Sequence, residues 1–470
     1  MRDSKTPQMG TATKTLGIIG AVVAVFYAII IALSPKPIPF PSPVPEFAPD
    51  ATLFDKVSGW ITGLVFYGPS ANGEYTIRIV VIWLITAAIF FTIWLGFINV
   101  RGFKHAIDLV RGKYSDPNDA GEVSHFQALA TAVSGTVGLG NIAALRQMAD
   151  GFGLGNIAGV AIAIAIGGPG ATFWMIVAGF LGMSLKAAEC MLGVKYRQEH
   201  ADGTVSGGPM YYLRDAVKDL GKPGLGKGLA AFFAVCMIGG AVGGGNMFQS
   251  NQATAQIVSQ VGGEESFLGR NTWIMGLLFA AAVGAVIIGG IKSIAKVTEQ
   301  IVPFIAILYL GACLIVLFGN FGEIPAAFGS ILDGAFTGEG AAGGVIGALI
   351  VGFQRAAFSN EAGLGSASVA HSAVRTKEPA TEGFVALLEP FIDTIVICTM
   401  TALTIIITKA YLDPAASELG GVALTSNAFA SVLPWFPKVL AVAVVLFAFS
   451  TMISWSYYGM KATGYLFGDN

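Results

Sequence analysis

Two stretches of this sequence combine glycine, hydroxyl side chains and asparagine inside apolar runs: SGTVGLGNIA at residues 134–143 and FQRAAFSNEAGLGSAS at residues 353–368. Glycine suits an interrupted helix because it tolerates unusual φ values and exposes its backbone. Within a bilayer such an interruption survives only where it lines a buried polar cavity. In secondary transporters, a pair of interrupted helices holds the substrate and the coupling ions. The alternative interpretation, glycine-rich packing faces of unbroken helices, is disfavoured because two similar stretches lie in helices of opposite predicted orientation.

The composition is that of a membrane protein. Of the 470 residues, 54% are hydrophobic and 12% are charged, whereas soluble domains carry about 25% charged residues. Glycine occurs 62 times, and small residues allow transmembrane helices to approach one another closely. These proportions exclude a disordered chain, a soluble enzyme and a secreted disulfide scaffold. The formal net charge of −2 gives no basis for binding nucleic acid.

Apolar runs long enough to cross a bilayer, which takes about 20 residues, recur along the chain. The first is expected to be a retained helix and not a signal peptide, because Pro35-Lys36-Pro37 follows it in place of a small-residue cleavage site. The proline-rich segment 36–75 resembles a stiff external connection. The predicted spans are residues 15–34, 78–98, 126–145, 154–167, 171–193, 229–258, 272–291, 299–319, 343–358, 382–409 and 437–458.

Lysine and arginine are concentrated in alternate connections between these spans, which predicts that those connections are cytoplasmic. The stretch RGFKHAIDLVRGK at residues 101–113 is strongly basic, and connections 194–228, 292–298 and 370–381 are basic as well. The alternation holds only if residues 124–167 cross the membrane once, which predicts an interrupted first core helix. The N-terminus is then expected in the cytoplasm, and the protein in a bacterial inner membrane.

Six motifs resemble, in order, the alanine or glycine:cation symporter family, of the sodium:alanine symporter type. They are SHFQALATAVSGTVGLGNIA, GVAIAIAIGGPGATFWM, SGGPMYYL, GGGNMFQSNQ, FSNEAGLGSASVAHSA and FAFSTMISWSYYG. The resemblance covers about residues 76–470. It implies an all-α multi-pass membrane protein with a leucine-transporter-like core of the APC superfamily, in which two five-helix repeats are inverted and two helices are discontinuous. It also implies sodium-coupled uptake of alanine or glycine by alternating access.

The resemblance divides the chain into regions. Residues 1–75 hold an extra N-terminal helix and the external connection, and residues 76–123 a pre-core helix and the basic cytoplasmic loop. Residues 124–320 form the first repeat. Residues 341–470 form a second repeat that is expected to lack the last two core helices. This incompleteness keeps a second hypothesis open, in which the chain is a truncated or degenerate homologue that does not transport, or an amino-acid sensor.

The resemblance also implies where the substrate binds. Backbone groups of the first interruption are expected to meet the substrate carboxylate and one cation. Asn246 and Gln249 are expected to hydrogen-bond the substrate, with Met247 and Phe248 shaping a small pocket. Trp455 is expected to form a pocket wall. The full predicted set is Thr136, Gly138, Gly140, Asn141, Asn246, Gln249, Phe358, Ser359, Asn360 and Trp455.

Sodium ligands are expected at Gly138, Ser450 and Thr451, because the implied fold places hydroxyl ligands on its eighth core helix. Hard cations prefer oxygen donors, and hydroxyls with carbonyls supply them without a buried countercharge. The predicted partners are therefore Na⁺ as coupling ion, a small amino acid and the lipid bilayer. The cysteines and histidines show no ligand spacing, so neither a transition-metal site nor a cofactor is expected. Without a nucleophile–base pair or a phosphate-binding loop, the chain is predicted not to be an enzyme.

The motif GLGNIA occurs twice, at residues 138–143 and 153–158. The chain therefore resembles the family with a 15-residue tandem duplication inside the interrupted helix. The insert brings Arg146 and Asp150 to a depth where a charge is costly. Either Asn141 or Asn156 fits the functional position, and Asn141 is favoured because Thr136 and the helix start are continuous with it.

Five further charged residues lie within or beside predicted spans. Glu361 is expected to cap the half-helix that follows it, with a role in cation coupling or proton binding as the alternative. Lys186 and Glu189 are interpreted as a pair that snorkels at the inner membrane face. Glu389 and Asp393 flank Pro390, so either a functional role or a structural kink is open for them.

Overall fold

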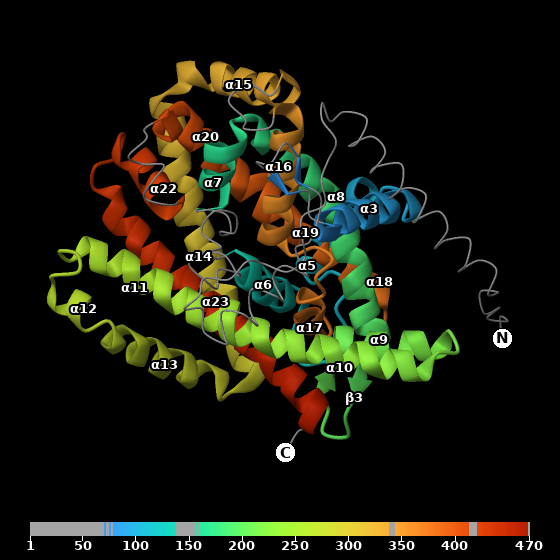
Figure 1. The fold of residues 1–470 in the computed structure, drawn as a ribbon. Coiled ribbons are helices and arrows are strands. Elements are labelled where there is room, and N and C mark those ends of the chain that lie inside the picture. The colour runs from blue at the N-terminus through green and yellow to red at the C-terminus, as the bar shows by residue number, and fades with distance from the viewer. Residues whose placement is uncertain are drawn as a thin grey trace, which may run out of the picture.

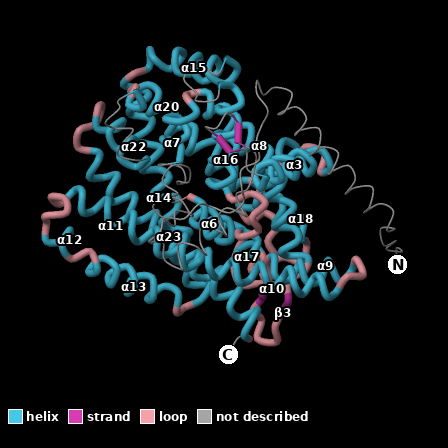
Figure 2. Tube along the Cα trace, in the orientation of Figure 1, coloured by secondary structure: helices cyan, strands magenta, loops and turns pink. Residues whose placement is uncertain are grey.

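The computed structural model describes residues 70–71, 75–76, 79–137, 157, 159–337, 344–412 and 421–468. Helices make up nearly all of this part of the chain, and the strands form two short antiparallel hairpins (Figures 1 and 2). These are β1 (Ser70–Ala71) with β2 (Tyr75–Thr76) and β3 (Gln198–Glu199) with β4 (Val205–Ser206). The first predicted span and both GLGNIA copies, except Ile157, lie outside the described residues.

Five described helices are long and apolar enough to cross a membrane, which confirms a multi-pass all-α membrane protein. Two shorter apolar helices, α3 (Ile79–Trp94) and α13 (Trp273–Ile287), accompany them. The long ones are α8 (Gly170–Lys195), the continuous run α10 (Pro223–Gly240), η3 (Ala241–Phe248) and α11 (Gln249–Gln260), α14 (Gly290–Gly319), the run α18 (Pro379–Ala386), α19 (Leu388–Pro390), η5 (Phe391–Cys398) and α20 (Thr399–Ile407), and α23 (Phe436–Phe467).

Shorter elements complete the described chain. The predicted connection 292–298 is part of a helix, because α14 begins at Gly290, and α15 and α22 were not predicted as helices. The remaining elements are α4 (Ile98–Arg101), α5 (Phe103–Val110), α9 (Pro209–Asp219), α12 (Phe267–Arg270), η4 (Phe321–Glu323), α15 (Ile324–Thr337), η6 (Ala410–Leu412) and α22 (Gly421–Ala430).

The described backbone leaves the helix at both stretches where the sequence predicts an interruption. Helix α6 (His125–Thr136) begins with a capping box at Ser124 and ends before Val137, whose ψ of 84° is not helical; α7 (Val160–Gly167) follows. Helix α16 (Gly344–Asn360) ends one residue before Glu361, which has φ 54°. Gly363 and Gly365 also have positive φ, which suits residues without a Cβ, and α17 (Ala367–His371) follows.

Helix α8 packs against five helices from different parts of the chain: α3, α15, α16, α17 and α18. Small residues allow this close packing. A Cβ added to Gly179 would lie 2.8 Å from the Thr394 side chain, and one added to Gly193 would lie 2.9 Å from the Ser368 carbonyl oxygen. The glycine-rich composition therefore serves close packing as well as interruption of helices.

The connections 111–124, 196–208 and 372–378 converge on one side of the molecule, which we call the basic face. The Glu122 amide donates to the Ala373 carbonyl at 2.7 Å, and the Arg375 amide donates to the Val123 carbonyl at 2.9 Å. Lys461, near the end of α23, donates to the Val205 carbonyl at 2.9 Å. In Figure 1 this face includes β3 and the C-terminal end of α23 at the lower edge, whereas α15 lies at the upper edge.

Arg197 joins these connections. Its guanidinium donates to the carbonyl oxygens of Ala120, Ser372, Val374 and Thr376, at 2.8, 3.1, 2.7 and 2.7 Å. An arginine presents several donors in a fixed plane, so it can hold several carbonyls at once. The segment that leads into α6 is thereby tied to the segment that leaves α17.

Candidate functional site

The last turn of α6 packs directly against the middle of α23. The Thr451 hydroxyl donates to the Ser134 carbonyl at 2.8 Å, and the Trp455 indole donates to the Gly135 carbonyl at 3.2 Å. All four residues are buried. Carbonyls in the last turn of a helix have no intrahelical partner, so α23 supplies partners where α6 ends. Two residues predicted from the sequence, Thr451 and Trp455, therefore contact the first interruption.

A group of buried hydroxyls surrounds this contact. Ser134 and Ser454 hydrogen-bond through their hydroxyls, and the Ser454 hydroxyl donates to the Thr131 carbonyl at 3.0 Å. Thr131 and Thr298 of α14 hydrogen-bond at 3.1 Å. We call Thr131, Ser134, Thr298, Thr451 and Ser454 the hydroxyl cluster. Only Thr451 was predicted as a site residue, although the spacing of Thr451 and Ser454 on one helix could have pointed to Ser454.

Ser450 and Thr136, the other described residues predicted near this interruption, have partners within their own helices. The Ser450 hydroxyl donates to the Phe447 carbonyl at 2.9 Å, and its own carbonyl accepts from the Ser134 hydroxyl at 3.3 Å. The Thr136 hydroxyl donates to the Val133 carbonyl at 3.2 Å. Ser450 therefore presents its carbonyl, and not its hydroxyl, to α6. Gly138, Gly140 and Asn141 lie outside the described residues.

The predicted amides of the third core helix lie in and beside η3, a widened helical turn. Asn246 donates to the Ala241 carbonyl at 2.8 Å and accepts from the Ser456 hydroxyl at 3.3 Å, while Gln249 donates to the Gly244 carbonyl at 3.3 Å. Phe248 is buried, but Met247 is 67% exposed, so the prediction that Met247 shapes a pocket is wrong. Its side chain lies on the outer surface of the helix.

Trp455 packs closely against this widened turn. A Cβ added to Gly245 would lie 2.3 Å from the Trp455 Cβ, so only glycine allows the present contact. The indole is 8% exposed and also contacts the Tyr458 ring. Trp455 thus lies between α6 and η3.

The second interruption is held by side chains of the run α18–α20. The Ser359 hydroxyl donates to Asp393 at 2.6 Å, and the Asn360 amide donates to the Thr394 hydroxyl at 2.9 Å. The Asn360 side-chain oxygen accepts the Ala362 backbone amide at 3.0 Å. Ser359 and Asn360 therefore lie close to the buried carboxylate of Asp393. For this residue the sequence allowed either a functional role or a structural kink. Phe358, beside them, is half-buried.

Glu189 of α8, and not Glu361, caps this interruption. A single oxygen of Glu189 accepts the backbone amides of Gly363 and Gly365, each at 3.0 Å. Glu361 instead accepts the Ser366 hydroxyl at 2.5 Å. Glu361 thus contacts the residue directly before α17, whereas the backbone amides of Gly363 and Gly365 are capped by a carboxylate from another helix.

Lys186 is buried and does not snorkel to the membrane surface, contrary to the prediction. Its ammonium lies 3.3 Å from Glu189 and 3.2 Å from Glu389, and both of its side-chain partners are buried as well. A buried charge requires a partner. Lys186 therefore balances the carboxylate that caps the second interruption and ties α8 to α19.

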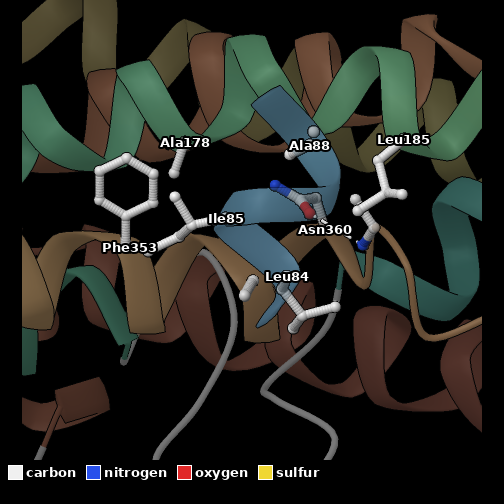
Figure 3. Close-up of a pocket in the computed structure, with 10 residues that line it drawn as sticks. Leu84, Ile85, Ala88, Ala178, Leu185, Phe353 and Asn360 are labelled. Atoms are coloured by element: carbon white, nitrogen blue, oxygen red, sulfur yellow. Dashed lines mark hydrogen bonds between the residues drawn. The ribbon is translucent and has the colours of Figure 1, made fainter. Parts of the chain in front are cut away.

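A small cavity lies beside the second interruption, between α3, α8 and α16 (Figure 3). Its volume is about 20 Å³, and its lining is apolar except for Asn360. A cavity of this size has room for about one water molecule, which is too little for an amino acid. Asn360 reaches this cavity from the interruption, whereas Phe353 and Ile85 cover its other sides.

Tyr458 is a buried residue that the sequence did not single out. Its hydroxyl has no hydrogen-bond partner among the described residues, and a Cβ added to Gly135 would lie 3.2 Å from it. The hydroxyl therefore lies beside the last turn of α6. Tyr458 follows Trp455 by three residues on α23, which is about one helical turn. An unpartnered buried hydroxyl costs free energy, so it marks a place where a bound group would supply a partner.

These contacts gather polar side chains and backbone carbonyls at the two interruptions. The described residues include no group of histidine, cysteine, aspartate or glutamate side chains that could hold a metal ion of the transition series. Hydroxyls and carbonyls gather at the first interruption, and an amide, hydroxyls and one carboxylate gather at the second. Interrupted membrane helices use such groups to hold ions and polar solutes.

Known proteins place the chain among membrane transporters. The family model described as "Sodium:alanine symporter family" matches residues 69–147 and 143–470, so its two matches meet inside the duplicated segment. The chain is 41% identical to "Sodium/alanine symporter AgcS" of Methanococcus maripaludis over 82% of this chain and 80% of that protein. It is 35% identical to "Probable sodium/glutamine symporter GlnT" of Bacillus subtilis over 84% of this chain and 76% of that protein.

A third relative, "Putative sodium/proton-dependent alanine carrier protein YrbD" of Bacillus subtilis, is 35% identical over 80% of this chain and 73% of that protein. The family match spans all the described helices, including both interruptions. Cation-coupled symport of an amino acid, rather than enzymatic catalysis, is the activity that these similarities support. The chain belongs to the sodium:alanine symporter family.

Proposed function

We propose that this protein couples the inward movement of Na⁺ to the uptake of a small neutral amino acid, alanine or glycine, by alternating access. The observation that carries the proposal is the contact between the last turn of α6 and α23, where Thr451 and Trp455 hold the carbonyls of Ser134 and Gly135. The printed names of the relatives support sodium and alanine as the transported pair.

The hydroxyl cluster is the proposed surrounding of the sodium ion. Its members supply neutral oxygen atoms, and the carbonyls of Ser134 and Ser450 face it. A monovalent cation gains from such hard oxygen donors, and an interrupted helix frees carbonyls for coordination. In this proposal Thr451, the Ser450 carbonyl and Gly138 share the ion. The Thr451 hydroxyl would turn its oxygen toward the ion when the ion binds.

The amino acid is proposed to bind between the two interruptions. Thr136, Gly138, Gly140 and Asn141 would meet its carboxylate from the first interruption, and Phe358, Ser359 and Asn360 would meet it from the second. Asn246 and Gln249 already form hydrogen bonds with carbonyls of their own helix, so either amide would exchange such a bond for one to the substrate. Trp455 and Tyr458 would close the pocket, which favours a small side chain.

The inverted arrangement of two repeats, residues 124–320 and 341–470, belongs to this proposal. So does the orientation. The basic face carries the connections rich in lysine and arginine, and such connections remain in the cytoplasm. We therefore assign the basic face, and with it the N-terminus, to the cytoplasmic side of a bacterial inner membrane.

Uptake of radiolabelled alanine into proteoliposomes tests the proposal. An inward Na⁺ gradient is expected to drive accumulation above the external concentration, whereas an equal K⁺ gradient is not. Glycine should compete with labelled alanine, and glutamine should compete less, which separates the substrate from that named for one relative. Accumulation that is equal with and without the Na⁺ gradient would contradict sodium coupling.

A non-transporting homologue or an amino-acid sensor is the second candidate, favoured by the duplication within the first interrupted helix. It predicts a folded protein that binds alanine but accumulates none under any gradient. The same proteoliposomes, combined with a binding measurement on the protein used to make them, distinguish the two candidates.

A further inference from the structure

One buried carboxylate connects the half-helices next to both interruptions. His125 is the first residue of α6, and His371 is the last residue of α17. Their Nδ1 atoms contact different oxygens of Glu382 on α18, His125 at Oε1 and His371 at Oε2, the latter at 2.5 Å. All three side chains are at most 4% exposed. We call this group the histidine bridge.

The protonation of the bridge follows from its geometry. A carboxylate only accepts hydrogen bonds, so both imidazoles donate from Nδ1. When neither Nε2 atom carries a proton, each histidine is neutral and the bridge as a whole carries the negative charge of Glu382. A further proton can be added only at an Nε2 atom. The Nε2 atom of His371 is buried and has no hydrogen-bond partner among the described residues.

Nearby charges leave the charge of the bridge uncompensated. Lys186 pairs with Glu189 and with Glu389, and no described lysine or arginine forms an ion pair with Glu382. The helices that pack against α6, α17 and α18 carry these titratable groups: Lys104, His105 and Asp108 on α5; Lys186, Glu189, Cys190 and Lys195 on α8; Lys292, Lys296, Glu299, Tyr309 and Cys313 on α14; Glu389 on α19; and Lys438, Tyr457, Tyr458, Lys461 and Tyr465 on α23.

We infer that His125, Glu382 and His371 form a binding site for one proton, and that the bound proton holds the basic face closed. One added proton turns a neutral donor into an imidazolium paired with the carboxylate, which cancels the buried charge. A hydrogen bond between two charged groups is also about twice as strong as a neutral one. The three groups titrate together, so the proton belongs to the bridge and not to one residue.

The location of the bridge converts proton binding into a conformational effect. Opening of the basic face would separate α6 from α17, and the bridge lies between them beside the carbonyls that Arg197 holds. Both histidines would then meet water, where an added proton no longer cancels a buried negative charge. The closed state binds the proton more tightly than the open state. Acidification on this side therefore favours the closed state, and opening releases a proton there.

Amide hydrogen exchange of the full-length protein in detergent micelles tests this inference. Peptides that cover residues 125–137 report the opening of α6, after correction for the intrinsic pH dependence of exchange. Protection in the wild type is expected to rise as the pH falls from 7.5 to 6.0, by at most about tenfold per pH unit for one linked proton.

Two variants remove the proton site in different ways. Glu382→Gln keeps the shape and one acceptor oxygen but removes the charge, and His371→Gln keeps a donor amide and leaves Glu382 intact. Glu382→Gln should lose the pH dependence of protection, and His371→Gln, which keeps the contact between His125 and Glu382, should reduce it. His105→Gln is the matched control, because this half-buried histidine packs against Phe384 of α18 without contacting Glu382, and it should retain the wild-type dependence.

The inference is overturned if protection in the wild type does not change with pH, or if Glu382→Gln keeps the full dependence. Because the inference rests on the proposed alternating access, the same samples are also tested for alanine uptake. A pH-dependent bridge in a protein that accumulates no alanine would contradict the proposed function alone. Uptake with a pH-independent bridge would contradict the inference alone.

Discussion

Thr451 on α23 donates its hydroxyl hydrogen to the carbonyl of Ser134, 317 residues earlier in the chain, at 2.8 Å. This contact brings the last turn before the first interruption against a helix of the second half of the chain. It also places a hydroxyl predicted from the sequence as a sodium ligand beside a freed carbonyl. The proposed coupling between ion and substrate depends on this junction.

Replacing Thr451 with valine should weaken sodium dependence more than substrate selectivity. Valine keeps the branched shape but supplies no oxygen, so the ion loses one donor while the packing of α23 changes little. We expect the Na⁺ concentration for half-maximal alanine uptake to rise about tenfold, which corresponds to a loss of about 1.4 kcal/mol. Thr463→Val is the control, because Thr463 is exposed on the same helix and bonds only the Gly459 carbonyl. An unchanged Na⁺ requirement in Thr451→Val would remove this hydroxyl from the ion site.

Adding a methyl group at Gly245 should displace Trp455. The new Cβ would lie 2.3 Å from the Trp455 Cβ, so one of the two helices must shift. Such overpacking costs about 1–3 kcal/mol, and we expect a lower thermal midpoint in detergent together with reduced alanine affinity. Gly243→Ala, where a Cβ would have no neighbour within 4 Å, makes the same chemical change two residues away. The same thermal midpoint and the same alanine affinity in both variants would show that the close contact between Gly245 and Trp455 is not required for stability or binding.

Removing the buried ammonium of Lys186 should destabilise the protein strongly. Lys186→Met leaves Glu189 and Glu389 as buried carboxylates without their cation, and breaking a buried ion pair by removing one partner costs about 3–5 kcal/mol. Adding Glu389→Gln to this variant should restore part of the loss, because one uncompensated charge disappears. Lys218→Met, at an exposed position on α9, is the control for loss of a lysine. Thermal unfolding in detergent measures all of these effects, and a stable Lys186→Met would contradict the ion-pair assignment.

Deleting residues 144–158 should leave a functional first interruption. The deletion removes one GLGNIA copy with its spacer and joins Ala143 to Gly159, so Arg146 and Asp150 no longer lie within the span. Because buried charges at membrane depth are costly, we expect alanine uptake at least equal to that of the full chain. Uptake lost on deletion of 144–158, in a protein that remains monodisperse, would show that the 15-residue segment itself is required for transport.

Local features of the sequence predicted much of the fold. The combination of Asn360, Gly363 and Gly365 correctly indicated the interruption between α16 and α17, because the asparagine bonds to nearby backbone and glycine tolerates positive φ. The apolar runs and the basic connections also predicted the long helices and the face on which those connections meet. These predictions succeeded because composition within a short window determines them.

Contacts between distant segments could not be predicted in the same way. Glu189 caps a turn that lies 174 residues later, and Glu382 joins a histidine 257 residues earlier in the chain. From the sequence, Glu189 and Lys186 matched a surface pair on one helix, and Glu361 matched a local cap. The packing of α8 against α17 and α19 determines the actual partners. It brings Glu189 of α8 to the backbone amides of Gly363 and Gly365, and Glu389 of α19 to the Lys186 ammonium.

Alanine binding to the purified protein, measured by titration calorimetry at low and high Na⁺ with K⁺ keeping the ionic strength constant, tests the central claim most directly. If the ion and the amino acid bind together at the junction of α6 and α23, the affinity for alanine should rise at least about fivefold with Na⁺, as typical coupling energies between sites predict. Alanine binding of the same affinity in K⁺ as in Na⁺ would contradict the account.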